Sequence, residues 1–548
     1  MDRPTTLERF VHLVVAVVVV GLAVYPIHAR YLHLELQEQF PRNAVVAVSQ
    51  RDWAPFGLHH GAAFFELLRA VYTVWFAGGW LAGTYPTRLH FLADFLRDPF
   101  PFVVVGRLTV LAIAALGALL VLRLSTRLFG RTAATASVFV LGTTFGWVRG
   151  LHHVWIDVPS AVAALAAAMA ALRFSATGTT ATAVGAGMLG GLTLATNHSM
   201  FPIAAPLTVA ALLGPPAGPR VVLGRLAAAW GAMAAAFVAL SPYAIVGWRE
   251  APQALTVLNR IFLAATTASL TLAEAVGYGA GWAVPSLAAV GFITAVTSAL
   301  RPALVLATFP LCYLAVLGRV DALYLRDLTA LWPFVAVFAG YGALVLGRWL
   351  SPRRPGPLTA LFTVLAVATP AWQSLQLDRF LARRDTREIA GEWILANVPR
   401  GTPLVLPNAV RYPNPILPPS EAQLHFEYAA QSAALHAPEF DGLADAYPTT
   451  FLAVLARFSN WTPQPGSVVV EAQHPAVLAD YNFPPALREQ LVAAGALPLV
   501  RFTAVTDPPP EGVAYDPLDA DYAPLVGFES LERPGPNITI WRVPQRTP

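Results

Sequence analysis

Long apolar runs separated by short polar stretches occupy the first two thirds of this 548-residue chain. Each run approaches the ~20 apolar residues with which a helix crosses about 30 Å of hydrocarbon. Charged residues make up 12% of the chain, against roughly 25% in an average soluble protein. The sequence predicts a polytopic α-helical membrane protein, not a soluble enzyme or a disordered scaffold. About eleven transmembrane helices are expected, the first uncleaved, near 11–27, 102–122, 133–149, 158–173, 181–196, 200–213, 226–246, 283–299, 303–317, 329–347 and 357–375.

The charge distribution divides the chain into two predicted domains. Residues 1–377 carry 24 Arg and 13 acidic residues, whereas residues 378–548 carry 12 Arg and 19 acidic residues. The basic part is apolar and is predicted to be the transmembrane domain, and the acidic part is predicted to be a soluble domain. Arginines beside a bilayer indicate topology and contact with anionic lipid, and no nucleic-acid-binding motif occurs. The single cysteine, Cys312, excludes a disulfide within the chain and a cysteine-based metal site.

Segment 61–82 is apolar enough to span a membrane, but Glu66, Arg69 and Thr73 form a polar stripe on one helical face. If this segment lies in the membrane interface, the arginines of RLSTRLFGR and of later loops fall on the inner side, as the positive-inside rule favours. We therefore predict that 28–101 is one long outer loop with interfacial helices, including the amphipathic stretch 87–98. The N-terminus is then inside, and the C-terminal domain is outside.

The C-terminal domain is expected to be a small α/β domain. RDTREIAGEWILANVP predicts a helix that ends before Pro399. The proline-rich stretch 399–419 is expected to be irregular. The runs at 467–472 and 537–543 are typical of strands.

Four polar residues are concentrated in RGLHHVWIDVP, between two apolar runs: Arg149, His152, His153 and Asp157. Polar residues at membrane depth are costly and often functional. Asp157 before Val158-Pro159 also fits a helix start, where a carboxylate is favoured by the helix dipole. Asp157 is therefore either a helix cap or, with the His pair and Arg149, part of an outward-facing site for a phosphate or a divalent ion.

A second acidic group lies in the first outer loop, where Glu35 and Glu38 of HLELQEQF would share one helical face. The alternative is a solvated helix surface. His59 and His60 follow in RDWAPFGLHHG. Adjacent histidines point to different sides of a helix, so at most one of them would contribute to a cavity.

The order of these features resembles the GT-C superfamily of polyprenyl-phosphate-sugar-dependent glycosyltransferases. Relatives within that superfamily include the protein O-mannosyltransferases and the aminoarabinose transferases of lipid A. The similarity runs from the acidic outer loop and the W-x-P element to the span that ends in H-x-x-x-D-V-P. It continues through GGLTLATNHSMFPIAAPL and YLRDLTALWPFVAVFAGYG into the tail phrases DTREIAGEWILANVPRGT and YAPLVGFESLERPGPNITIWRV.

The resemblance implies a membrane glycosyltransferase of a bacterial cytoplasmic membrane, with a polyprenyl-phosphate sugar donor and a glycan, lipid or protein acceptor. A carboxylate would act as the general base toward the acceptor hydroxyl, and positive charge would stabilise the departing phosphate. A single displacement would invert the anomeric centre. The resemblance assigns the general base to Glu38, with Glu35 in reserve. Asp157 is expected to orient the acceptor or to bind a divalent cation. The expected phosphate-binding residues are Arg149, His153 and Arg326.

Two departures from the family pattern bear on this interpretation. The outer loop reads ELQE where the family typically carries an Asp-Glu pair, and Asn197-His198 stands where a basic residue is often found. Asn197, His198, His59 and His60 are further cavity candidates. The alternative interpretation of Arg326 is that it anchors its helix at the membrane interface. The competing interpretations of the whole chain are a catalytically inactive GT-C relative and a lipid or sugar transporter, although the symmetric halves expected of many transporters are not evident.

Overall fold

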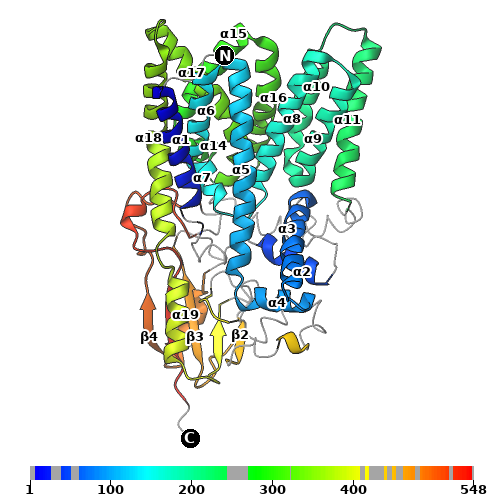
Figure 1. The fold of residues 1–548 in the computed structure, drawn as a ribbon. Coiled ribbons are helices and arrows are strands. Elements are labelled where there is room, and N and C mark those ends of the chain that lie inside the picture. Colours follow the sequence, from blue (N-terminus) through cyan, green and yellow to red (C-terminus); the bar gives the residue numbers. More distant parts are fainter. Residues whose placement is uncertain are drawn as a thin grey trace. The chain divides into compact units, whose positions relative to one another are not determined.

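The structure of the chain is a computed structural model (Figure 1). It describes residues 6–25, 27, 39–50, 61–242, 270–320, 323–407, 414–418, 437–440, 447–451, 461–475, 482–516 and 522–545. These residues fall into two compact units. The first comprises residues 1–27, 53–70 and 105–375, and the second comprises 28–52, 71–104 and 376–548.

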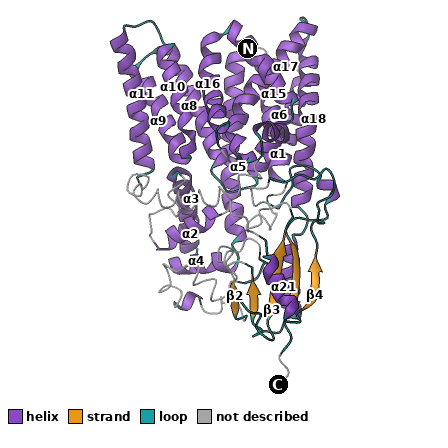
Figure 2. Cartoon of the chain, turned by 180° about the vertical axis from the view of Figure 1, so that it is seen from behind, coloured by secondary structure: helices purple, strands orange, loops and turns teal. Residues whose placement is uncertain are grey.

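The first unit is built from helices, drawn in purple in Figure 2. Three helices cross a unit boundary along the chain: α3 (Ala62–Leu81), α5 (Phe100–Phe129) and α18 (Pro355–Leu381). The others are α1 (Thr6–Val24), α6 (Arg131–Thr143), α7 (Phe145–Leu151), α8 (Asp157–Thr177), α9 (Thr180–Thr196), η3 (His198–Ile203), α10 (Ala204–Leu212), α11 (Pro219–Leu240), α14 (Leu272–Ala280), α15 (Ala283–Ser298), α16 (Leu300–Leu317), η5 (Leu325–Leu331) and α17 (Trp332–Leu350).

Each predicted apolar run coincides with a helix, but fewer helices have the length of a span. Within the described residues, six helical segments are long and apolar enough to cross a membrane, or seven if the bent pair α14 and α15 counts as one. The predicted number of about eleven is therefore not confirmed. One reason lies at Thr144, whose extended backbone splits the run 133–149 into α6 and α7. The apolar helices nevertheless identify an integral membrane protein.

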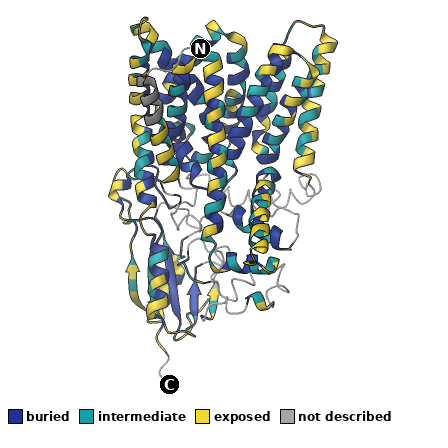
Figure 3. Cartoon of the chain, in the orientation of Figure 1, coloured by how far each residue is buried: buried dark blue, intermediate teal, exposed yellow. Residues whose placement is uncertain are grey.

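Burial within the first unit differs sharply from helix to helix (Figure 3). Most of α8 and α17 is buried, whereas α11 buries only Ala229. α11 packs on α9 through glycines, because a Cβ on Gly187 would lie 2.1 Å from the Ala229 carbonyl oxygen. A Cβ on Gly191 would lie 2.4 Å from the Met233 carbonyl oxygen. Small residues let the two helix backbones approach closely.

The expected α/β domain is present in the second unit as a five-stranded sheet of order β2-β1-β3-β5-β4. β1 pairs in parallel with both β2 and β3, and β5 pairs antiparallel with β3 and β4. The strands are β1 (Leu404–Leu406), β2 (Thr449–Phe451), β3 (Val468–Gln473), β4 (Leu497–Phe502) and β5 (Asn537–Arg542). The stretch 399–419 was expected to be irregular, but it contains β1, a strand too short to show alternation.

Each face of this sheet has its own apolar core. Alternate residues of β3 point to opposite faces, so Val468 and Val470 pack with Ile394 of α19 (Thr386–Asn397). Val469 packs on the other face with Leu491 of α21 (Pro485–Ala493). The second unit also contains α2 (Gln39–Gln50), α4 (Arg88–Arg97), η8 (Pro438–Phe440) and η10 (Phe528–Ser530).

A buried carboxylate on β3 is hydrogen-bonded to the α21 helix. Glu471 is 1% exposed. Its carboxylate accepts a 2.6 Å hydrogen bond from Arg488 of α21 and a 2.7 Å bond from the Trp541 indole of β5. Arg488 also donates to the Gln473 side chain at 2.7 Å. A buried charge requires such partners, so this cluster couples a helix to two strands.

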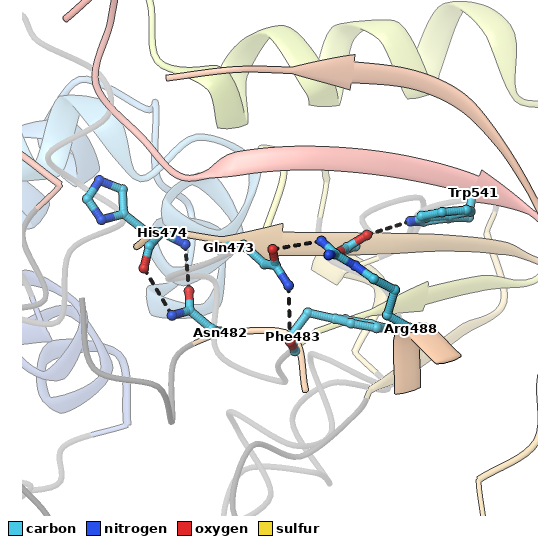
Figure 4. Close-up of polar contacts among 7 residues, drawn as sticks. Gln473, His474, Asn482, Phe483, Arg488 and Trp541 are labelled. Atoms are coloured by element: carbon cyan, nitrogen blue, oxygen red, sulfur yellow. Dashed lines mark hydrogen bonds and ion pairs between the residues drawn. The ribbon is translucent and has the colours of Figure 1, made fainter. Parts of the chain in front are cut away.

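His474 follows β3 and is also buried. Its ring lies 4.6 Å from the Tyr515 ring and 5.2 Å from the Tyr522 ring. Its backbone exchanges hydrogen bonds with the Asn482 side chain at 2.6 and 3.0 Å (Figure 4). Burial lowers the pKa of the His474 imidazole to about 3, so this side chain is neutral at physiological pH.

The amphipathic stretch 87–98 forms α4, whose apolar side chains are buried in an aromatic cluster within the second unit. Phe91 contacts Trp75 at 5.8 Å and Phe102 at 5.1 Å between ring centres. The neighbouring helix α3 exposes Val74, Trp80 and Leu81. The interfacial placement of this loop stays a prediction.

Candidate active site

The polar cluster 149–157 forms the connection between α7 and α8 in the first unit. Arg149 lies in the last turn of α7 and is 5% exposed. His152 and His153 follow in the connection, and both are buried. Asp157 is the first residue of α8, because Ile156 occupies the N-cap position without a side-chain hydrogen bond. Asp157 is therefore inside the helix start, where the dipole favours its carboxylate, rather than at the cap itself.

Arg326 of η5 lies beside this connection. Its guanidinium carbon is 5.5 Å from the centre of the Trp155 ring and 4.4 Å from the centre of the Tyr324 ring. A guanidinium stacked on aromatic faces keeps its N–H donors at its edge, in the plane that suits a carboxylate or a phosphate. Trp155 belongs to the α7–α8 connection, so the structure brings Arg326 together with the 149–157 cluster.

A second carboxylate is close by. Asp327 accepts a 3.0 Å hydrogen bond from the Tyr324 backbone N–H and so closes the first turn of η5. The Tyr313 hydroxyl of α16 interacts electrostatically with both Asp327 and Asp157. Asp157, Asp327 and Tyr313 thus come from three helices and converge on one region.

Asn197 and His198 differ in their relation to this region. Asn197 accepts hydrogen bonds from the backbone N–H of Ser199 at 3.0 Å and from its hydroxyl at 2.8 Å. Ser199 in turn lies near the Tyr313 hydroxyl, so Asn197 is connected to the site through one residue. The His198 ring packs edge-on against Phe237 of α11 at 5.6 Å.

Two buried polar atoms at the end of η5 and the start of α17 have no hydrogen-bond partner among the described residues: Thr329 Oγ1 and Trp332 Nε1. Both side chains face α7, since a Cβ on Gly146 would lie 2.7 Å from Trp332 Nε1 and a Cβ on Gly150 would lie 3.8 Å from Thr329 Oγ1. Glycine at position 146 is therefore required for α7 to pack this closely. The tight contact fixes η5, and with it Arg326, against α7.

The other predicted site residues lie outside the described residues. These are Glu35, Glu38, His59 and His60. Within the part of the chain that the structure describes, no group of three His, Cys, Asp or Glu side chains could hold a metal ion. The described residues therefore do not by themselves provide a divalent-cation site at Asp157.

Sequence reasoning missed three residues of this region: Trp155, Asp327 and Tyr313. Trp155 lies two residues after His153, and Asp327 directly follows Arg326. Closeness in sequence to these predicted site residues was a weak signal for both. Tyr313 is one hydroxyl within an apolar run, and a buried tyrosine is ordinarily a core residue. Only the fold shows that it lies near two carboxylates.

The arrangement combines a stacked, oriented arginine with two carboxylates at helix starts. The buried Arg149 and His153 lie in the same connection as Trp155. Such a region is suited to a substrate that carries both an anionic group and hydroxyl groups. Positive charge can hold the anion, and carboxylates can accept hydrogen bonds from hydroxyls.

Comparison with solved structures identifies the fold. ArnT from Cupriavidus metallidurans bound to undecaprenyl phosphate matches with a TM-score of 0.51 and 13% identity, over 96% of this chain and 97% of that chain. The same enzyme in the apo state matches with a TM-score of 0.50, 13% identity and the same coverage. The chain therefore has the GT-C fold, the fold that its sequence resemblance predicted.

The Archaeoglobus fulgidus oligosaccharyltransferase, in complex with Zn and sulfate, has a TM-score of 0.43 and 14% identity, over 71% of this chain. The chain spans about 60% of the length of that protein. No protein-family model matches the sequence. Curated protein sequences give no significant match either.

Proposed function

We propose that this protein is a membrane glycosyltransferase that moves a sugar from a polyprenyl-phosphate donor to an acceptor hydroxyl on the extracytoplasmic face. The observation that carries the proposal is the likeness in fold, over almost the full length of both chains, to an ArnT structure that holds undecaprenyl phosphate. The cluster of Arg326, Asp157 and Asp327 in the first unit supports it, because such a donor presents a phosphate beside sugar hydroxyls.

In the proposed reaction, the acceptor oxygen attacks the anomeric carbon of the sugar. The bond between that carbon and the phosphate oxygen breaks, and the electron pair stays on the phosphate. The proton of the acceptor hydroxyl passes to a carboxylate, for which Glu38 is the proposed base and Glu35 the reserve. One displacement inverts the anomeric centre.

The described residues have distinct proposed roles. Arg326, held by Trp155 and Tyr324, would bind the phosphate with two parallel hydrogen bonds and stabilise its growing charge. Arg149 and His153 would add positive charge to the same group. Asp157 would orient the acceptor or hold a divalent cation.

The test is transfer of a labelled sugar from an undecaprenyl-phosphate donor panel in proteoliposomes of defined orientation. Glu38→Gln should abolish transfer while undecaprenyl phosphate still binds, because the amide keeps the shape but does not accept the proton. Label that crosses the bilayer without being transferred would indicate a transporter. Binding of undecaprenyl phosphate without turnover of any donor would indicate an inactive relative.

A further inference from the structure

The indole of Trp332 lies where three helices of the first unit meet. Trp332 is the first residue of α17 and directly follows η5. A Cβ on Gly146 of α7 would lie 2.7 Å from its Nε1 atom, and a Cβ on Gly279 of α14 would lie 2.6 Å from its Cζ2 atom. Real Cβ atoms essentially never approach other atoms within 3.0 Å. Two glycines on different helices therefore make room for one tryptophan ring.

Packing holds this ring in place. Trp332 is buried, and its Nε1 atom has no hydrogen-bond partner among the described residues. Its helix, α17, is packed tightly on two sides. A Cβ on Gly340 would collide with the Ser137 hydroxyl of α6, and a Cβ on Gly342 would collide with a backbone oxygen of α15. α17 therefore has little room to move when a group is added beside the indole, and the strain falls on η5.

η5 connects the ring to the candidate site. Of its seven residues only Arg326 and Asp327 are half-buried. The others are buried, and they are Leu325, Leu328, Thr329, Ala330 and Leu331. Leu325, which directly precedes Arg326, also lies against α14, since a Cβ on Gly279 would lie 3.1 Å from its Cδ1 atom. A close-packed segment of this kind moves as one piece, so the position of Trp332 is also the position of Arg326.

The contact between Arg326 and Trp155 is sensitive to a small shift of η5. Its 5.5 Å distance lies ~0.5 Å inside the range of about 6 Å for a cation–π contact. Ordinary van der Waals contact begins at 3.4 Å, so a methyl group on Gly146 would displace the indole by about 0.7 Å. Trp155 belongs to the connection that follows α7, so a shift of η5 relative to α7 is also a shift relative to Trp155.

We propose that Trp332 is a positioning residue of the donor-phosphate site. Seated on Gly146 and Gly279, its indole sets the position of η5 and so keeps Arg326 in contact with Trp155. The inference rests on the proposed function, in which Arg326 binds the donor phosphate. Trp332 acts through the guanidinium, whose N–H donors recognise two phosphate oxygens only in a fixed orientation. The alternative is a tryptophan that stabilises the core and has no influence on the site.

The experiment measures the Kd of undecaprenyl phosphate for the full chain by native mass spectrometry, without sugar transfer. Gly146→Ala should raise this Kd about fivefold, as expected for the loss of one orienting contact. Gly231→Ala on α11 is the matched control, because it also replaces a helical glycine and its Cβ would meet nothing within 4 Å. Undecaprenol, which has the same chain without the phosphate, should bind equally to the wild type and to both variants.

Double variants separate positioning from stability. Trp332→Phe makes room beside position 146, so Gly146→Ala with Trp332→Phe should bind undecaprenyl phosphate more tightly than Gly146→Ala alone. Arg326→Gln should raise the Kd about tenfold, the loss typical of a hydrogen bond to a charged group. Adding Gly146→Ala to Arg326→Gln should change the Kd less than about twofold, because the residue that Trp332 positions is already absent.

Trp332→Phe alone provides the same cycle without a steric clash, and its loss of affinity should likewise vanish in the Arg326→Gln background. An equal loss in both backgrounds, or no recovery in Gly146→Ala with Trp332→Phe, would overturn the inference and leave the proposed function standing. Undiminished binding of undecaprenyl phosphate by Arg326→Gln would instead remove the phosphate role of Arg326 from the proposed function, and the role of Trp332 with it.

Discussion

Arg326 makes a cation–π contact with Trp155, with its guanidinium carbon 5.5 Å from the centre of the indole ring. The contact joins η5 to the connection between α7 and α8, two segments that are distant in sequence. Cation–π contact with tryptophan is the strongest of its kind and strengthens when it is shielded from water. It orients an arginine in a way that a lysine would not reproduce.

Arg326→Lys should therefore reduce sugar transfer about tenfold or more and raise the KM for the donor, although the charge is kept. Arg319→Lys is the matched control, since Arg319 is exposed and its guanidinium donates a 3.2 Å hydrogen bond to the Ala315 carbonyl of the preceding helix. Steady-state transfer rates over a range of donor concentrations give the maximal transfer rate and the KM of each variant. Identical kinetics for the two variants would remove Arg326 from the phosphate site.

Asp157→Asn should reduce transfer by about two orders of magnitude, the range typical of a lost acid–base or orienting group. Loss of the helix-dipole interaction alone costs only about 0.3–1 kcal/mol of stability. Glu274→Gln is the control for that effect, because Glu274 is also a first-turn acidic residue and closes a capping box with Thr271. Transfer rates and yields of folded protein should separate the variants. Normal turnover in Asp157→Asn would leave this carboxylate a purely helix-stabilising role.

The buried His474 should make the soluble domain sensitive to acid. Its pKa is about 3 in the folded chain and about 6.5 when unfolded. Below pH 6.5 the unfolded state binds a proton that the folded state excludes, so stability falls as the pH decreases toward 3. The loss at pH 5 should be about 2 kcal/mol.

The measurement is calorimetric unfolding of the full chain at pH 7 and pH 5. His474→Phe keeps the ring contacts with Tyr515 and Tyr522 but does not titrate, so the domain transition should shift less between the two pH values. An equal shift in the wild-type chain and the variant would assign the acid sensitivity to other groups.

Arg488→Gln should destabilise the soluble domain by about 1–2 kcal/mol, because it leaves the buried Glu471 carboxylate with one fewer charged partner. The double variant Glu471→Gln with Arg488→Gln should cost less than the sum of the single changes. Arg501→Gln, at an exposed position on β4, should fall within about 0.5 kcal/mol of the wild type. Thermal unfolding provides the comparison, and additive effects at Glu471 and Arg488 would contradict the coupling.

The sequence predicted the apolar helices well because burial in lipid demands long apolar runs. It did not predict where those runs break, since the split at Thr144 depends on backbone geometry that hydropathy does not record. β3 and β5 were predicted from their β-branched residues, whereas β1 and β2 have three residues each and are defined only by their partners.

The same distinction applies to the candidate site. Arg149, His153 and Asp157 are close in sequence, so their grouping was evident without a fold. The contact of Arg326 with Trp155, and the electrostatic interaction of Tyr313 with Asp157 and Asp327, depend on the packing of separate helices. No local pattern contains that information.

The exposed face of α11, a helix that buries only Ala229, has a consequence for the choice of host membrane. Its 22 residues extend about 33 Å, slightly more than the average hydrocarbon thickness of about 30 Å. A thinner bilayer would be accommodated by tilting α11, and the tilt would be transmitted to α9 where Gly187 and Gly191 hold the two backbones together. α9 in turn packs on α8, because Phe174 of α8 shares one apolar core with Ala183 of α9 and Ala229 of α11. Bilayer thickness should therefore act on this protein first through the α9–α11 pair and reach the interior through α8.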